Sequence, residues 1–114
     1  WSSVFASFTD NGGSPSSTRT TTAKTLVLNN GSGNTTISRT TSDGITVAYS
    51  TNGSSYSSFS TSHTFSFTSG TLYVKFRKTF PKFGGSFTDT FRFTNNSVSV
   101  DRNVTMTAFD GGSP

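Results

Sequence analysis

The sequence contains no cysteine, no glutamate and no glutamine, and only 12% of its residues are charged. Without cysteine, there can be no disulfide, cysteine–zinc site, thiol nucleophile or iron–sulfur cluster. The carboxylates are five aspartates, and the only imidazole belongs to His63. Paired-carboxylate, multi-histidine and triad chemistry therefore have little material to use. We expect a non-enzymatic protein that holds no cofactor and no metal.

Long apolar runs and strong charge are also missing. No stretch approaches the roughly 18 apolar residues that a membrane-spanning helix needs, so we expect no membrane span. Nine Lys and Arg residues against five Asp residues give a net charge of +4, which raises the question of an anionic partner. Four of these cations fall within residues 75–82, so the charge pattern indicates one local basic segment.

Serine, threonine and phenylalanine dominate what remains. The 114 residues include 22 Ser, 22 Thr and 12 Phe, and the length suits one domain with a single core. Large aromatic side chains and abundant Thr are typical of β-strands. A disordered chain would have fewer aromatic and more charged residues. The composition therefore predicts an all-β domain.

Apolar residues alternate with polar ones along most of the chain, as they do in half-buried strands. Over residues 72–78, Leu72, Val74 and Phe76 would face a core, and the residues between them would face solvent. Similar alternation occurs at 26–28, 45–49, 65–67, 87–94 and 98–108. Turn-forming Gly, Asn, Asp and Pro separate these runs about every ten residues. The pattern predicts an immunoglobulin-like β-sandwich of seven to eight antiparallel strands.

The two ends of the chain lack this alternation. We assign residues 23–109 to the sandwich and residues 1–22 to an extended N-terminal arm or edge segment, because residues 9–22 carry no large apolar side chain. Residues 110–114 form a C-terminal tail or linker. The chain begins at Trp1 and not at Met, which is typical of a processed or excised product that has lost a leader.

Two stretches resemble a known family. Residues 24–38, KTLVLNNGSGNTTIS, are similar to the strand, turn and strand of immunoglobulin-like domains of the abnormal-spindle and hydin type. Residues 69–76 and 84–96 resemble that family's later strand signature. The resemblance extends over residues 17–109 and implies an immunoglobulin-like sandwich with no shared catalytic residue. Bacterial surface and secreted proteins, cilia-associated proteins and phage structural proteins carry such domains. Residues 78–83 depart from it, because the family has a shorter and less basic turn there.

Four apolar residues near the N-terminus form the first candidate binding site. Trp1, Val4, Phe5 and Phe8 lie ahead of the polar part of residues 1–22. Apolar side chains on a free tail would stay in contact with water, so they should pack either on this domain or on a neighbour. An arm of this kind could also add a strand to a neighbour's sheet edge and lock subunits together.

The second candidate site combines cations with aromatic rings, and its members are Lys75, Arg77, Lys78, Phe80, Lys82 and Phe83. Such a stretch can form a solvated strand face, dock on an acidic protein or glycan surface, or bind a nucleic-acid backbone. We favour a solvated face for Lys75 and Arg77. Phe80 and Phe83 flank Pro81 and are the better candidates for an interface.

Two functions fit these features. The first is a structural or assembly module, with a phage virion decoration, fibre or other capsid-associated protein as the leading example; its partners would be copies of itself or capsid proteins. The alternative is a secreted or bacterial cell-surface adhesin or carbohydrate-binding module, for which Tyr49, Tyr56 and Tyr73 could stack on sugars. We expect the protein at a virion surface or, in the alternative, outside the cell. We expect oligomeric assembly and no nucleic-acid partner.

Overall fold

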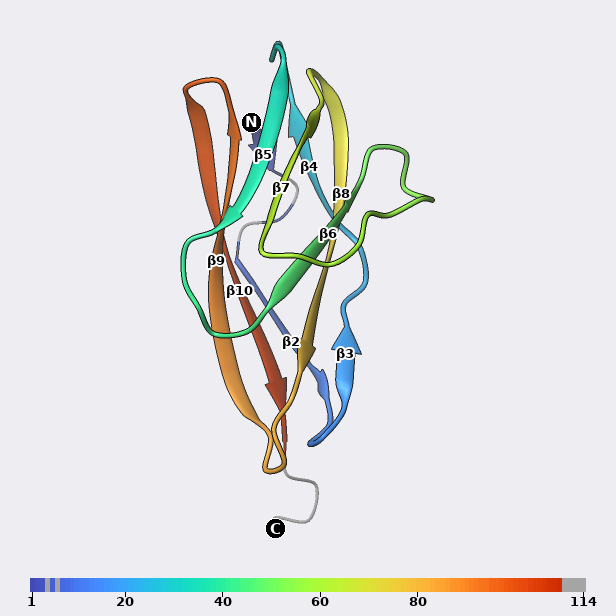
Figure 1. The fold of residues 1–114 in the computed structure, drawn as a ribbon, viewed down its shortest axis with the longest axis vertical. Helices are drawn as coiled ribbons and strands as arrows, with labels where there is room; N and C mark the ends of the chain where they lie inside the picture. The colour runs from blue at the N-terminus through green and yellow to red at the C-terminus, as the bar shows by residue number, and fades with distance from the viewer. Residues whose placement is uncertain (4, 6, 110–114) are drawn as a thin grey trace.

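The structure is a computed structural model that describes residues 1–3, 5 and 7–109. It confirms an all-β, immunoglobulin-like sandwich made of two five-stranded sheets. The molecule is elongated, with principal extents of 51 × 25 × 21 Å, and its strands run along the long axis (Figure 1). The part of the chain that the structure describes has no helix of the length and apolarity needed to cross a membrane.

Sheet A is organised around one long strand, β8. One edge of β8 pairs with β4 and, further along, with β3, while its other edge pairs with β6. A short strand, β1, extends the sheet beyond β4. The bounds are β1 Ser2–Ser3, β3 Thr18–Thr20, β4 Lys24–Leu28, β6 Thr46–Ser50 and β8 Gly70–Thr79.

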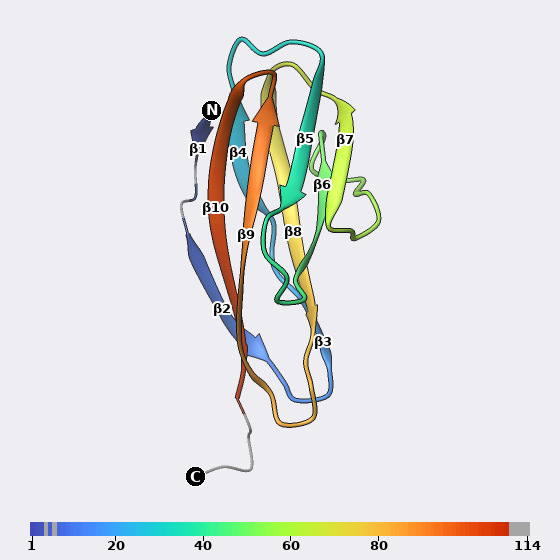
Figure 2. The same cartoon turned by 60° about the vertical axis from the view of Figure 1, so that its left-hand side comes forward.

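Sheet B has the order β2, β10, β9, β5, β7, which Figure 2 shows from left to right. The bounds are β2 Phe8–Gly13, β5 Asn34–Arg39, β7 Ser62–Ser66, β9 Gly85–Asn95 and β10 Val98–Ala108. All pairings are antiparallel except the one between β2 and β10, which is parallel. The described residues thus form ten strands, where the alternation predicts seven or eight.

The core lies between the two sheets and follows the predicted alternation. Leu72, Val74 and Phe76 of β8 are fully buried and face Phe91 and Phe93 of β9. The Phe76 and Phe91 rings lie 5.0 Å apart. Large aromatic side chains thus provide much of the buried apolar area, as expected for a chain with few aliphatic residues.

The segment at residues 1–22, for which the sequence left an arm or an edge segment open, lies on the sheet edges. β1 and β3 join sheet A, and β2 joins sheet B. Between β3 and β4 the chain stays beside β8, because the buried residue Thr21 bonds to Phe76. The Thr21 N–H donates to the Phe76 carbonyl oxygen at 2.8 Å, and the Thr21 hydroxyl accepts from the Phe76 N–H at 3.1 Å. Residues 110–114, the expected tail or linker, lie outside the described residues.

Two buried polar side chains of β9 hold loops in place: Asp89 from the middle of the strand and Asn95 from its end. The Asp89 carboxylate accepts hydrogen bonds from the Thr41 hydroxyl and from the backbone N–H groups of Asp43 and Ile45. The Asn95 amide bonds to the backbone N–H of Ser32 and to the Phe67 carbonyl oxygen. Both side chains face the core, so β9 combines apolar packing with loop anchoring.

Candidate functional site

The N-terminal apolar residues pack on this domain's own core. Trp1, Phe5 and Phe8 are half-buried against it. The Trp1 ring meets Phe93 edge-on at 6.1 Å, and the Phe8 ring lies 5.7 Å from Phe76. Val4, the fourth member of the predicted cluster, lies outside the described residues. Of the two alternatives left open for this candidate site, packing on this domain is therefore the one found for Trp1, Phe5 and Phe8.

Phe80 requires a correction. It is only 3% exposed and belongs to the core, although it follows a strand and precedes a turn. The β2 backbone at Gly13 lies directly against its ring, where any side chain would collide. Its own N–H donates to the Ser17 carbonyl oxygen at 2.9 Å. Since residues 13–17 cover Phe80, this side chain is removed from the candidate interface.

Lys75 and Arg77 point outward from sheet A, as predicted, and the polar head of each lies against an aromatic ring of the loop between β6 and β7; Lys75 is half-buried and Arg77 stays exposed. The Lys75 ammonium lies 4.4 Å from the centre of the Tyr56 ring, and the Arg77 guanidinium lies 4.4 Å from that of Phe59. Burial raises the pKa of the Tyr56 phenol, and the nearby Tyr73 phenol adds to this rise. These cation–π contacts occupy the two cations within the chain.

Lys78 belongs to the inward-facing side of β8, near the end of the sandwich. Its ammonium lies 4.2 Å from the centre of the Phe87 ring and directly beside Gly44. The aliphatic part of the side chain is half-buried and the charge reaches the edge of the core, as long basic side chains commonly do. Lys78 is thus a structural residue at the seam between the sheets.

Lys82 and Phe83 remain on an open surface. Phe83 is 73% exposed, and the Lys82 ammonium lies 5.5 Å from the centre of its ring. A second exposed aromatic residue, Phe109, is 63% exposed and follows the last strand. Pro81, Lys82, Phe83 and Phe109 are referred to as the aromatic end.

The turns at this end of the molecule are braced against one another. Gly84, with φ of +70°, places its backbone against the carbonyl oxygen of Ala108, where a Cβ would collide. This contact joins the residues next to Phe83 and Phe109. The Ser16 N–H also donates to the Pro81 carbonyl oxygen at 3.1 Å. Figure 1 shows the three segments together at the lower end of the sandwich. The aromatic end is therefore held in place by turns from three parts of the chain.

The opposite end holds a cavity of about 230 Å³. Its lining combines apolar with amide side chains, and the residues are Trp1, Leu28, Asn29, Asn30, Gly31, Asn95, Asn96, Ser97 and Val98. The indole N–H of Trp1 donates to the Val98 carbonyl oxygen at 3.3 Å, which fixes the ring at the rim. We refer to this feature as the asparagine cavity; it could not be predicted from the sequence, because its lining comes from Trp1 and from two turns that are distant in the chain.

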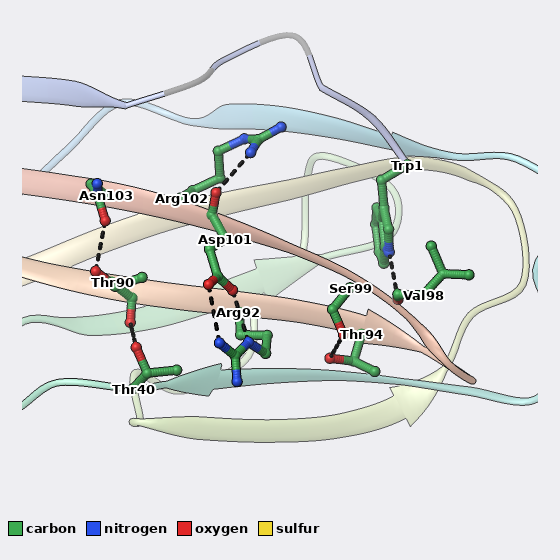
Figure 3. A network of polar contacts seen from close by, with 10 residues as sticks. All are labelled: Trp1, Thr40, Thr90, Arg92, Thr94, Val98, Ser99, Asp101, Arg102 and Asn103. Carbon is green, nitrogen blue, oxygen red and sulfur yellow. Dashed lines mark hydrogen bonds and ion pairs between the residues drawn. The ribbon is translucent and has the colours of Figure 1, made fainter.

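The outer face of sheet B carries rows of paired polar side chains, some of which Figure 3 shows. The Thr90 hydroxyl donates to the Asn103 amide oxygen at 2.6 Å, and Arg92 forms an ion pair with Asp101 at 2.8 Å. The hydrogen bond from Arg92 lowers the pKa of the Asp101 carboxyl. These groups satisfy one another across the strands, so the face offers few unpaired polar groups to a ligand.

The remaining sequence candidates have structural roles. Tyr49 stacks on Phe65 with ring centres 3.8 Å apart, so the three tyrosines do not form an exposed sugar platform. His63 donates from Nε2 to the Val47 carbonyl oxygen at 2.7 Å, since only a protonated nitrogen can bond to a carbonyl. Among the described residues, no group of three or more His, Cys, Asp or Glu side chains could hold a metal ion.

The two β-sheets, packed face to face, define an immunoglobulin-like fold. Among solved structures, the chain is similar to the ASH/PapD-like domain of human CEP192 (PapD-like domain 7), with a TM-score of 0.54 and 11% identity. The match covers 92% of this chain and 82% of that chain. No protein-family model and no curated protein matches the sequence. At this identity the likeness establishes the fold, and the function has to be argued from the surface.

Proposed function

We propose that this chain is a non-enzymatic assembly module that docks its aromatic end on a protein partner within a larger particle. The observation that carries the proposal is the exposure of Phe83 and Phe109 at one end of a rigid sandwich. Exposed aromatic groups that neighbour each other are typical of protein-interaction sites. A virion decoration or fibre protein, at the virion surface, is the setting that we propose for it.

The chemistry of the aromatic end indicates what kind of partner it fits. Phe83 and Phe109 require an apolar recess, and Lys82 adds a positive charge beside them. Because the whole chain carries a net charge of +4, an acidic rim around that recess would steer the approach. A partner with an apolar pocket bordered by carboxylates therefore matches this surface.

Replacing Phe83 with Ser tests the proposal. We expect Phe83→Ser to fold with a stability within about 0.5 kcal/mol of the wild type, because the side chain is mostly exposed, and to lose incorporation into its native particle. Thermal unfolding and the composition of the purified particle would be measured. A photo-crosslinking residue at position 83 should give an adduct that the same residue at Ser99 does not. Normal incorporation of Phe83→Ser would refute the proposal.

A second function, binding of a sugar by a secreted or cell-surface adhesin, rests on the asparagine cavity. Amide side chains with an aromatic ring at the rim are groups that recognise sugar hydroxyls and ring faces. The cavity, of about 230 Å³, is smaller than the roughly 300–1,000 Å³ of sites for drug-sized ligands. It therefore suits a single sugar ring.

Fluorescence provides a direct test of the sugar function, because Trp1 is the only tryptophan in the chain. Titration with a panel of monosaccharides should change the Trp1 emission in a saturable way in the wild type. The Asn29→Ala variant should weaken this response at least tenfold, since it removes a lining amide. Phe83→Ser, at the far end of the molecule, serves as a matched control and should respond normally. A flat titration with every sugar would exclude this second function.

A further inference from the structure

We propose that the free edge of β7 is a self-association site at which two copies of this chain pair antiparallel about Thr64, forming one continuous ten-stranded sheet. This inference does not depend on the aromatic end, because β7 lies on a long side of the sandwich (Figure 2). β7 is the last strand of sheet B and pairs only with β5 among the described strands.

The register of β7 on β5 shows which backbone groups face outward. The Arg39 N–H donates to the Thr61 carbonyl oxygen, and the Phe67 N–H donates to that of Gly33. Odd-numbered residues of this segment thus bond to β5, and in an antiparallel pair the alternate residues point the other way. The N–H and C=O groups of Ser62, Thr64 and Ser66 therefore face the open edge. On that side the Ser62 N–H donates within the described chain to the hydroxyl of Ser60, at the long distance of 3.5 Å.

The other sheet edges of the described chain are protected. β1 and β3 have two and three residues, and short edge strands pair poorly. The edge of β6 is covered because Val47 exchanges both backbone bonds with Ser60. β2 contains two glycines, and the Arg19 guanidinium ion-pairs with its Asp10. β7 is longer than β1 and β3, contains no proline and no Asp, Glu, Lys or Arg, and pairs on its outer edge with no other described strand.

Contacts between β7 and β6 hold β7 in an extended conformation, so the strand is already arranged for pairing with a further strand. The Phe65 ring stacks on Tyr49 of β6 with an angle of 9° between the planes. The His63 side chain bonds to the Val47 carbonyl oxygen across the same seam. A strand that is already fixed in an extended conformation loses little further entropy on pairing.

A second copy of the chain is the occupant that the composition of this edge favours. Residues 44–74 contain no Asp, Glu, Lys or Arg, so two copies with a net charge of +4 each can meet here without placing like charges in contact. Antiparallel pairing about Thr64 sets Ser62 opposite Ser66 and Thr64 opposite its own copy. The outward N–H and C=O groups then satisfy one another, and hydroxyl side chains meet hydroxyls, as Thr36 and Thr64 already do at 3.4 Å.

Sedimentation of the purified chain tests the site. Five-residue strands bury less than about 1,200 Å², the range of weak complexes, so we expect a dimer with a Kd of about 10 µM to 1 mM. Thr64→Lys should remain folded and monomeric, because two lysines would lie directly opposite each other. Ser99→Lys, which adds the same charge on the outer face of β10, should dimerise like the wild type. Phe83→Ser should also dimerise, which separates this site from the aromatic end.

A charge-swap experiment tests the two-fold register. Thr64→Lys and Thr64→Asp should each be monomeric alone and should form a heterodimer when mixed, because opposite charges then face each other. Amide exchange of Thr64 and Ser66 should slow as the wild-type concentration rises. A wild type that stays monomeric up to about 1 mM, or a Thr64→Lys variant that still dimerises, overturns the proposal. Exchange that slows only when an extended peptide from another protein is added overturns the choice of a second copy.

Discussion

Deleting residues 1–16 is expected to abolish the folded state. The deletion removes β1 and β2, and with them Trp1, Phe5 and Phe8, which are half-buried on the core. Burial of each aromatic side chain contributes about 1–3 kcal/mol, and the net stability of a small domain is only about 5–15 kcal/mol. Circular dichroism should show loss of the cooperative thermal transition.

The deletion also uncovers residues that the remaining chain cannot protect. Gly13 lies against the Phe80 ring, and the Ser16 N–H bonds to the Pro81 carbonyl oxygen. Without them Phe80 becomes exposed, and β10 loses its parallel partner along one edge. A newly opened edge beside exposed aromatic rings favours aggregation, so we expect the truncated chain to be insoluble or unfolded.

A single substitution measures how much one of these N-terminal aromatic residues contributes to the free energy of unfolding. Phe8→Ala should lower the free energy of unfolding by about 2–3 kcal/mol, less than a fully buried phenylalanine because the ring is half-exposed. Thr9→Ala on the same strand has an exposed side chain and should change it by less than about 0.5 kcal/mol. Urea titration of both variants gives the comparison.

A truncated chain that melts cooperatively at the wild-type temperature would contradict the deletion prediction and would show that residues 1–16 are a dispensable arm.

The alternation of apolar residues was sufficient to predict the long central strands. Leu72, Val74 and Phe76 are buried as expected, because a strand between two sheets must show one apolar face. Val98 continues the same pattern yet is 54% exposed, since it lies at the hairpin end. Residues 8–20 contribute two strands without any alternation, because an edge strand is largely solvated and its sequence is less constrained.

Contacts between distant parts of the chain could not be predicted. Phe80 reads as a loop aromatic, and the residues that bury it come more than 60 positions earlier in the sequence. Lys75 and Arg77 follow the outward pattern correctly, but nothing in that pattern reveals the loop aromatic rings that lie against them. Of the basic and aromatic candidates, Lys82 and Phe83 are exposed at the tip of a turn, and Arg77 is exposed beside the Phe59 ring on the outer face of sheet A.

Asp89 interrupts the apolar alternation of residues 87–94, and the structure gives this break a specific role. It occupies the core-facing side of β9 between Phe87 and Phe91, where the pattern calls for an apolar residue. A buried carboxylate must be satisfied by hydrogen bonds. The structure supplies them from the loop between β5 and β6, including the backbone N–H groups of Asp43 and Ile45, both at 2.8 Å. This side chain therefore accepts three of the hydrogen bonds that hold the loop on sheet B.

Asp89→Ala is expected to be the most destabilising single substitution outside the apolar core, costing about 3–5 kcal/mol. It leaves the buried N–H of Ile45 and the N–H of Asp43 without acceptors, at about 1–3 kcal/mol each, and it opens a cavity behind β9. Asp89→Asn should cost about 1–3 kcal/mol, because the carboxylate accepts bonds at both oxygens and an amide must turn its NH₂ toward one donor.

Asp101 offers a matched control, since it is an aspartate on the neighbouring strand of the same sheet. Its ion pair with Arg92 is exposed, and exposed pairs contribute little to stability because water and salt screen them. Asp101→Ala should therefore leave the urea midpoint nearly unchanged, while Asp89→Ala lowers it strongly. Amide exchange at Asp43 and Ile45 should accelerate only in the Asp89 variants. Equal effects of the two alanine substitutions would mean that the loop between β5 and β6 is held by Arg39, which bonds to the Thr41 and Ile45 carbonyl oxygens, and not by the buried carboxylate.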